Sequence, residues 1–282
     1  MYGSFGILIQ WMGGEMSVLN QIIFRYFLAV VLILGLMMIA RPKLKVPKKA
    51  WPVLIVFAII TQVSIWSFTK GAVLTSIPSL LGSFYIGSIV SATLVGFSVF
   101  REKLALKNWI GTFLAIFGLY ILSKNFVGNQ GILYGLAAGS LECVTQGIRK
   151  YLGGVSKGAI LLTSLLGVLA VSLGSALMSG NAFHVPELTT TWIGGSIFAL
   201  LVGVVNLLIT YGFRLLPMNV GSVIMSGEIF FGTLFSSIFL STKPTGPELF
   251  ASIAVLLSIL IQNWVIKEDN RLVLSIRKML ED

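Results

Sequence analysis

Long apolar stretches recur along the whole chain, and short polar or glycine- and proline-containing segments separate them. A helix needs about 20 mostly apolar residues to cross the ~30 Å hydrocarbon core of a bilayer. The pattern therefore predicts ten membrane-spanning helices. Their predicted ranges are 1–13, 17–40, 52–70, 77–99, 105–123, 131–151, 158–179, 189–213, 217–240 and 246–266.

The first predicted helix is much shorter than the other nine. At 1.5 Å per residue, 1–13 reaches only ~20 Å. Either the sequence starts late or it lacks the first half of this helix, and the internal repeat described below favours truncation.

Composition supports the membrane assignment and excludes other classes. Hydrophobic residues make up 56% of the chain and charged residues 11%, whereas soluble proteins carry roughly 25% charged residues. So few charges cannot keep a fold of this size dispersed in water. The composition predicts an all-α integral membrane protein, with the lipid bilayer as a partner, and excludes a soluble enzyme, a nucleic-acid binder and a disordered chain.

The basic residues lie on alternate connections, which predicts the orientation. One side carries sixteen Lys and Arg and the other three, Lys70, Lys124 and Lys243, while Arg25 stays inside a predicted helix. Basic connections face the cytoplasm, so we expect a cytoplasmic (inner) membrane protein with both termini inside. The sixteen are Arg41, Lys43, Lys45, Lys48, Lys49, Arg101, Lys103, Lys107, Arg149, Lys150, Lys157, Arg214, Lys267, Arg271, Arg277 and Lys278.

Residues that bind metals or form disulfides are scarce. The chain has one cysteine, Cys143, and one histidine, His184. These exclude a disulfide framework and argue against a multi-histidine metal or haem site, and we expect no cofactor. Cys143 lies in an apolar stretch and is interpreted as a small packing residue.

The two halves of the chain resemble each other at an offset of about 139–141 residues. Pro78 then falls near Pro217, and each opens the fourth helix of its half. This predicts two five-helix repeats, 1–126 and 127–266, followed by a cytoplasmic tail, 267–282. Because five is odd, the second repeat enters the bilayer from the opposite face, as in many carriers that work by alternating access. The alternative is chance similarity among apolar segments.

Several segments resemble the EamA-type transporters of the drug/metabolite transporter superfamily. In that family a glutamate follows the fourth helix and precedes a glycine-containing fifth helix, as Glu102 and Gly111 do here. Gly3 and Arg25 resemble the family's first two helices. The chain departs from the pattern at Thr242, which replaces a second glutamate, and at Ile89 and Ile229, where proline is common. The resembling segments are Thr75-Ser76-Ile77-Pro78, Val99-Phe100-Arg101-Glu102-Lys103, Trp109-Ile110-Gly111, Phe117-Gly118-Leu119-Tyr120, Tyr211-Gly212-Phe213-Arg214-Leu215-Leu216-Pro217 and Ser226-Gly227-Glu228.

The resemblance implies a ten-helix transporter that exports small metabolites or amino acids across the cytoplasmic membrane. It also implies a central cavity lined by helices one to four and six to nine, with helices five and ten at the periphery.

Three charged residues fall inside predicted helices: Arg25, Glu142 and Glu228. A charge at mid-bilayer costs roughly 2.5–3.5 kcal/mol on insertion scales, so it needs a partner or a polar cavity. Three interpretations stay open. A carboxylate binds and releases a proton, or it binds a substrate ammonium while Arg25 holds a carboxylate, or the groups form a structural ion pair.

Neutral polar residues inside the predicted helices complete the candidate substrate- or proton-binding set. Each can hydrogen-bond a substrate or a neighbouring helix. Aromatic residues, among them Phe68 and Phe84, can stack on a planar substrate. The neutral candidates are Gln10, Gln62, Tyr85, Gln146, Asn206 and Tyr211.

Two further features bear on packing and gating. Gly131, Gly135 and Gly139 line one face of the sixth helix, and small residues four apart predict close contact with another helix. Glu102 lies at the cytoplasmic interface, where it is either a solvated ion pair or part of a gate.

The sequence favours a secondary active or facilitative transporter of a small metabolite, an amino acid or related compound. The alternatives are a membrane-embedded enzyme and a channel, but no catalytic motif or filter motif is present. An ATP-driven pump needs a soluble nucleotide-binding segment, which this chain lacks. Proton coupling is a hypothesis, the state is monomer or homodimer, and the residues fix neither the substrate nor the direction.

Overall fold

The structure is a computed structural model that describes residues 2–122, 129–180, 185–187, 189–239 and 245–263. Lys124, His184, Thr242, Lys243 and the predicted tail, 267–282, lie outside the described residues. The described part is all-helical, in agreement with the predicted class. Its elements are α1 (Tyr2–Gly13), α2 (Val18–Ala40), the 3-10 turn η1 (Lys48–Ala50), α3 (Trp51–Leu74), α4 (Ile77–Ser98), α5 (Leu106–Leu122), α6 (Gln130–Tyr151), α7 (Lys157–Met178), α8 (Thr189–Leu215), α9 (Met218–Ser226), α10 (Glu228–Phe239) and α11 (Gly246–Asn263).

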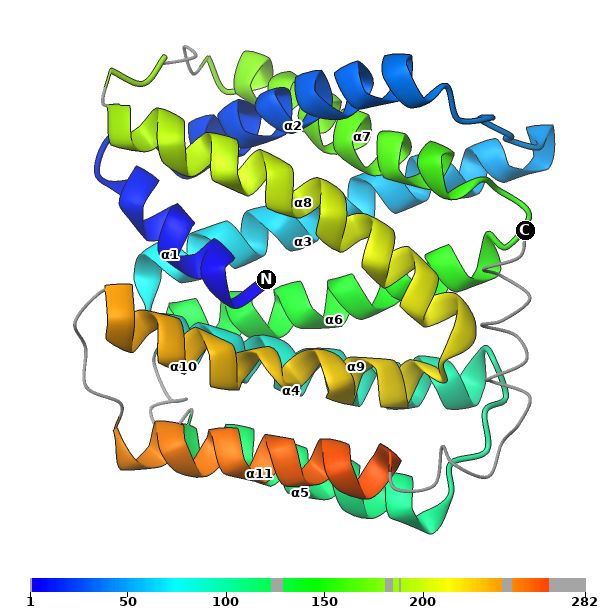
Figure 1. The fold of residues 1–282 in the computed structure, drawn as a ribbon, viewed down its shortest axis with the longest axis vertical. Coiled ribbons are helices and arrows are strands. Elements are labelled where there is room, and N and C mark those ends of the chain that lie inside the picture. The colour runs from blue at the N-terminus through cyan, green and yellow to red at the C-terminus, as the bar shows by residue number, and fades with distance from the viewer. Residues whose placement is uncertain (1, 123–128, 181–184, 188, 240–244, 264–282) are drawn as a thin grey trace.

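The chain runs back and forth along one common direction, and every predicted span has a helix (Figure 1). Polar caps fix several helix starts. Ser17 Oγ accepts a hydrogen bond from Asn20 N, and Ser156 Oγ accepts one from Ala159 N. Such side chains satisfy N–H groups that have no partner in the first turn.

The predicted ninth helix, 217–240, is not continuous. It breaks at Gly227 into α9 and α10, where Gly227 N donates to Ile224 O at 3.2 Å and Phe230 N donates to Gly227 O at 3.2 Å. These are tight three-residue bonds rather than α-helical ones, and glycine has a low helix propensity. The break makes Glu228 the first residue of α10.

Helix α6 packs closely against α4, as its glycine face predicts. A Cβ at Gly135 would lie 2.0 Å from Ser83 Oγ, and one at Gly139 would lie 1.8 Å from Phe84 O. Only glycine allows this approach, so the predicted close contact of this face with another helix is confirmed. On the adjacent side, Ser64 Oγ of α3 donates to Ala138 O of α6 at 2.9 Å.

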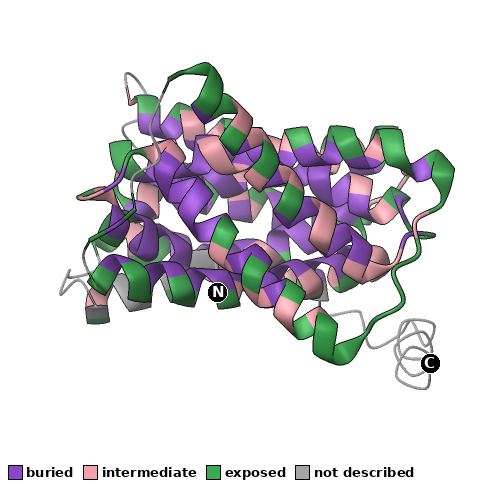
Figure 2. Ribbon diagram, turned by 90° about the horizontal axis from the view of Figure 1, so that it is seen from above, coloured by how far each residue is buried: buried purple, intermediate pink, exposed green. Residues whose placement is uncertain are grey.

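The surface exposes many large apolar side chains, and the largely apolar interior also contains buried polar residues. Large apolar side chains such as Ile39, Leu177 and Met178 are exposed, whereas Gln21, Ser83 and other polar residues are buried (Figure 2). A water-soluble fold does not expose this much contiguous apolar surface. Within the described residues, five helical segments are long and apolar enough to cross a membrane: α2, η1 with α3, α4, α7 and α8.

Helices α5 and α11 form a pair at one edge of the bundle (Figure 1). Ser258 Oγ of α11 donates to Gly111 O of α5 at 2.7 Å, and a Cβ at Gly118 would lie 2.7 Å from Ala254 Cβ. This is the peripheral position that the resemblance implies for the fifth and tenth helices.

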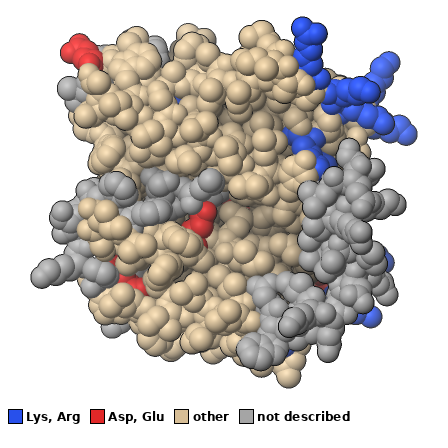
Figure 3. Space-filling model, in the orientation of Figure 1, with Lys and Arg blue, Asp and Glu red and all other residues tan. Residues whose placement is uncertain are grey.

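The exposed Lys and Arg on the face drawn in Figure 3 gather at one end of the molecule. The connection between α2 and α3 reaches that end, and its Lys43, Lys45, Lys48 and Lys49 are exposed. The lysines of this connection therefore belong to the basic end of the molecule.

Candidate functional site

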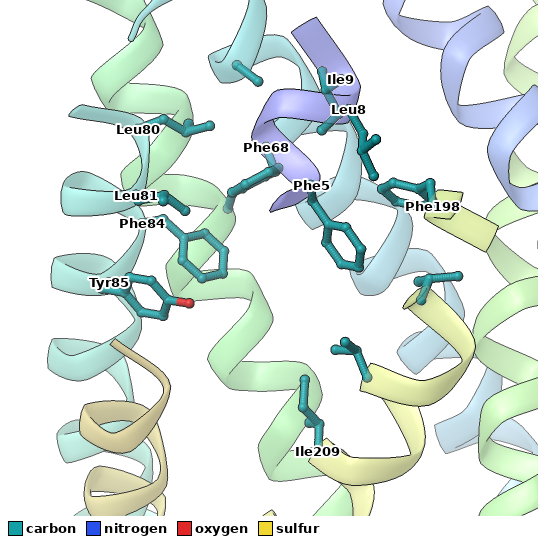
Figure 4. Packing of buried hydrophobic residues seen from close by; sticks show 14 of the residues in the cluster. Phe5, Leu8, Ile9, Phe68, Leu80, Leu81, Phe84, Tyr85, Phe198 and Ile209 are labelled. Atoms are coloured by element: carbon teal, nitrogen blue, oxygen red, sulfur yellow. The ribbon is translucent and has the colours of Figure 1, made fainter. Parts of the chain in front are cut away.

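A cavity of about 50 Å³ lies at the centre of the bundle. Its lining comes from seven helices, α1 to α4 and α6 to α8. Aromatic rings form part of the wall: Phe5 and Phe198 have centroids 4.5 Å apart, and Phe68 and Phe84 have centroids 5.3 Å apart (Figure 4). The charged and amide-bearing lining residues are Arg25, Glu142, Arg149 and Asn206.

Arg25 of α2 has no exposed surface. Its Nε donates to Gln21 O at 3.1 Å, and its Nη2 donates to Thr69 Oγ1 of α3 at 2.9 Å. The guanidinium carbon lies 4.4 Å from the centre of the Phe198 ring of α8, a cation–π contact. Among the described residues Nη1 has no hydrogen-bond partner. Three helices thus fix Arg25 at the cavity lining and leave Nη1 without a protein acceptor among the described residues.

Arg149 of α6 is 2% exposed and faces the same cavity. Its Nη2 donates to Asn206 Oδ1 of α8 at 2.6 Å, and its Nη1 contacts Asn206 O at 3.4 Å. The guanidinium carbon lies 5.4 Å from the Phe57 ring centre. In the described part of the chain its Nε has no partner.

The prediction that Arg149 belongs to a cytoplasmic connection is wrong. It lies in the last turn of α6, where its side chain turns inward to Asn206 while the next residue, Lys150, turns towards the end of the bundle. Adjacent helical positions point in different directions, so a basic pair at a helix end need not lie entirely in solvent.

Glu142 brings a carboxylate to the cavity from the middle of α6. Its Oε1 accepts a hydrogen bond from Gln146 Nε2, one helical turn later. Glu142, Gln146 and Arg149 are spaced i, i+4 and i+7, so they share one face of α6. That spacing was the sequence signal that could have identified Arg149.

Glu228 and Tyr85 meet at the break between α9 and α10. Tyr85 OH donates to Glu228 Oε2 at 2.7 Å. Tyr85 is fully buried in α4, whereas Glu228 is half-buried. A carboxylate in the first turn of a helix is favoured by the helix dipole. Neither residue of this pair lines the central cavity, whereas Arg25 and Glu142 do.

Four other candidates do not line the cavity, and one of them, Gln146, hydrogen-bonds the lining residue Glu142. Gln10 is exposed and its Nε2 donates to Ala72 O at 3.3 Å. Gln62 is buried in α3 beside the lining residue Thr61. Tyr211 is 41% exposed, and Lys157 Nζ lies 3.3 Å from its ring centre near the basic end of the bundle. The inter-helix contacts of Gln10 and the cation–π contact of Tyr211 account for their positions.

Sequence reasoning missed the small hydroxyl residues of the cavity. Thr61, Ser64 and Thr69 of α3 and Ser164 of α7 contribute to its lining. A single Ser or Thr in an apolar helix carries little signal because its hydroxyl can bond to its own backbone, as Thr61 Oγ1 does to Phe57 O at 2.6 Å.

Carboxylates connect separate helices at both ends of the bundle. At the basic end, Glu102 pairs with Lys150 and its Oε2 accepts from Met218 N, at the start of α9, at 2.9 Å. Lys150 Nζ also donates to Leu216 O at 3.0 Å. At the opposite end, Glu15 accepts a hydrogen bond from Thr191 Oγ1 in the first turn of α8. Glu102 is therefore largely buried in a contact between helices rather than solvated.

Within the described residues, no group of three or more His, Cys, Asp or Glu side chains comes together as a metal site.

Comparison with known proteins gives a family match and a structural match. Residues 1–124 match the EamA-like transporter family. A solved structure, titled only "Crystal structure of protein", superposes with a TM-score of 0.77 over 94% of this chain and 93% of that chain, at 13% sequence identity. At that identity the likeness shows a shared fold. No curated protein matches the chain.

Proposed function

We propose that this EamA-type membrane protein, whose residues 1–124 match that transporter family, is a secondary active or facilitative transporter. It moves a small metabolite, an amino acid or related compound, across the cytoplasmic membrane by alternating access, in the direction of export. The observation that carries the proposal is the charged central cavity, where Arg25, Arg149 and Glu142 meet among seven helices. Ionisable groups inside a membrane bundle mark substrate or ion pathways.

The packing of the helices supports two equivalent five-helix units, 1–126 and 127–266. The contact of α3 with α6 has its counterpart in α8 with α1, and α2 with α8 has its counterpart in α7 with α3. Helix α5 packs on its own counterpart, α11. An odd number of passes in each unit inverts the second relative to the first. Two inverted units around a central site suit alternating access.

The contacts at the two ends of the bundle are suited to gates. Opening the basic end separates Glu102 from Lys150 and from the start of α9. Opening the other end separates Glu15 from Thr191 of α8. Alternating access requires these contacts to break one end at a time, which exposes the cavity to one compartment and then to the other.

The basic end faces the cytoplasm in this proposal, because Lys and Arg are retained on the cytoplasmic side of membrane proteins. Both termini then lie inside. Coupling to protons, if the transporter is active, uses one of two carboxylates: Glu142 in the cavity or Glu228, which accepts a hydrogen bond from Tyr85.

Counterflow in liposomes tests the proposal. Purified protein is reconstituted into vesicles loaded with an unlabelled amino-acid mixture, and uptake of each labelled amino acid is followed. A carrier shows faster uptake when the lumen contains substrate, because the loaded carrier returns faster than the empty one. Uptake that does not depend on the internal solute indicates a channel, and the absence of uptake for every amino acid and organic acid tested overturns the proposal.

A further inference from the structure

The charges of the central cavity do not balance among its described lining residues. Arg25 and Arg149 contribute two positive charges and Glu142 contributes one negative charge. All three line the same cavity together with Tyr26. A net charge held in a low-dielectric interior is unfavourable. A bound solute that carries negative charge reduces this unfavourable net charge.

Both arginines also retain donors that their protein contacts do not use. Arg25 Nη1 and Arg149 Nε are buried and lack a partner among the described residues. A buried donor without an acceptor is costly. A guanidinium presents its N–H groups in a fixed planar fork that matches the two oxygens of a carboxylate. Each arginine therefore has one nitrogen without a protein acceptor, which can donate to an oxygen of a carboxylate.

Glu142 contributes a negative charge to the same cavity wall, and this charge suits a positively charged group on the substrate. Its carboxylate is oriented by Gln146, and a carboxylate accepts hydrogen bonds from an ammonium group. The lining thus presents two carboxylate-binding groups and one ammonium-binding group. The cavity volume of about 50 Å³ is smaller than an amino acid, so the cavity must widen when substrate enters, and a small solute requires less widening than one with a bulky ring.

We infer that the substrate is an acidic amino acid, such as aspartate or glutamate, whose two carboxylates bind Arg25 and Arg149 and whose ammonium group faces Glu142. This inference rests on the proposed transport function and narrows its substrate class. Neutral amino acids leave one guanidinium without an acceptor, and cationic ones add positive charge to a cavity that already has an excess of it.

Competition in the counterflow assay tests the inference. Vesicles that contain wild-type protein and unlabelled aspartate take up labelled aspartate, and external glutamate competes, whereas alanine, phenylalanine, lysine and inorganic phosphate do not. If a neutral or cationic amino acid shows trans-stimulation and aspartate and glutamate do not, the inference is wrong while the carrier function stands. If no solute shows trans-stimulation, both are wrong.

Variants separate recognition from structural support. We expect Arg149→Gln to lower the ratio of aspartate to alanine transport about tenfold or more, the effect of losing one charge-assisted pair, and Arg149→Lys to restore part of it. Lys103→Gln, at an exposed residue away from the cavity, should leave the ratio unchanged. A purely structural arginine lowers transport of all solutes alike, so an unchanged ratio in Arg149→Gln overturns the inference.

Ligand-induced thermal stabilisation in detergent provides a second readout that does not need transport. Aspartate should raise the unfolding temperature of the wild-type protein, and Arg149→Gln should lose that increase while the free protein still elutes as a single folded species. Equal stabilisation of both proteins by aspartate contradicts the assigned site.

Discussion

Gly139→Ala places one methyl group at the closest approach between α4 and α6. The added Cβ lies 1.8 Å from Phe84 O, 2.7 Å from Phe84 C and 3.0 Å from Phe84 Cα. Ordinary contacts between carbon atoms lie at about 3.5–4.0 Å. The obstructing atoms are backbone, which cannot turn away as a side chain can. The two helices must therefore separate by roughly 1.5 Å.

The expected cost follows from that displacement. Overpacking a tight core costs about 1–3 kcal/mol, and this contact joins the helices that carry Phe84 and Glu142 to the cavity. We expect Gly139→Ala to lower the free energy of unfolding by about 3 kcal/mol, at the upper end of that range. A loss of this size lowers the unfolding midpoint by roughly 6–12 °C in a chain of this length.

Gly174→Ala is the matched control, because Gly174 lies in α7 and an added Cβ meets nothing within 4 Å. There alanine should be neutral or slightly stabilising, since it favours helix more than glycine does. The midpoints are measured by size-exclusion chromatography after heating the detergent-solubilised proteins. Equal midpoints for the two variants would refute the close α4–α6 contact.

Three other substitutions probe the ends of the bundle and the broken helix. Glu102→Gln removes the charge that pairs with Lys150, so a thiol reagent applied from the basic end should modify a cysteine in the cavity faster; an unchanged rate argues against a gate there. Tyr85→Phe removes the hydrogen bond to Glu228 and should lower the free energy of unfolding, measured by thermal unfolding, by about 0.5–1.5 kcal/mol. An unchanged free energy of unfolding means that the bond does not stabilise the protein. Gly227→Ala should change the free energy of unfolding by no more than about 1 kcal/mol, because the nearest atom is the end of the Ile259 side chain. The same substitution should slow transport if the helix bends at this break during the transport cycle. Transport at the wild-type rate would exclude that role.

The helices themselves could be predicted because the bilayer imposes a simple rule. Apolar length and breakers fix each pass, and the predicted 77–99 and 189–213 agree with α4 and α8 to within two residues. Helix α6 is too polar to count among the apolar segments that are long enough to span a membrane. It could still be predicted, because the turns that flank it are clear. The break at Gly227 was missed because one glycine in an apolar stretch is compatible with a continuous helix.

The site was less predictable because it depends on which way side chains turn in three dimensions. Arg25 and Glu142 were found because charges inside a span are costly. Arg149 was missed because its position next to Lys150 suggests a solvated helix end, while Asn206 and Phe57 from other helices decide its burial. Tyr211 was included for its polarity alone, and the structure places it beside Lys157 at the surface.

The most direct test of alternating access is the accessibility of the cavity from each side of the membrane. Ser164 lines the cavity on α7, whereas Ser252 is buried in α11 away from it. In a Cys143→Ser background, the account predicts that Ser164→Cys reacts with a membrane-impermeant thiol reagent from either face, that substrate slows both reactions, and that Ser252→Cys stays unreactive. Reaction of Ser164→Cys from one face only, or no faster than Ser252→Cys, contradicts a cavity that opens to each compartment in turn.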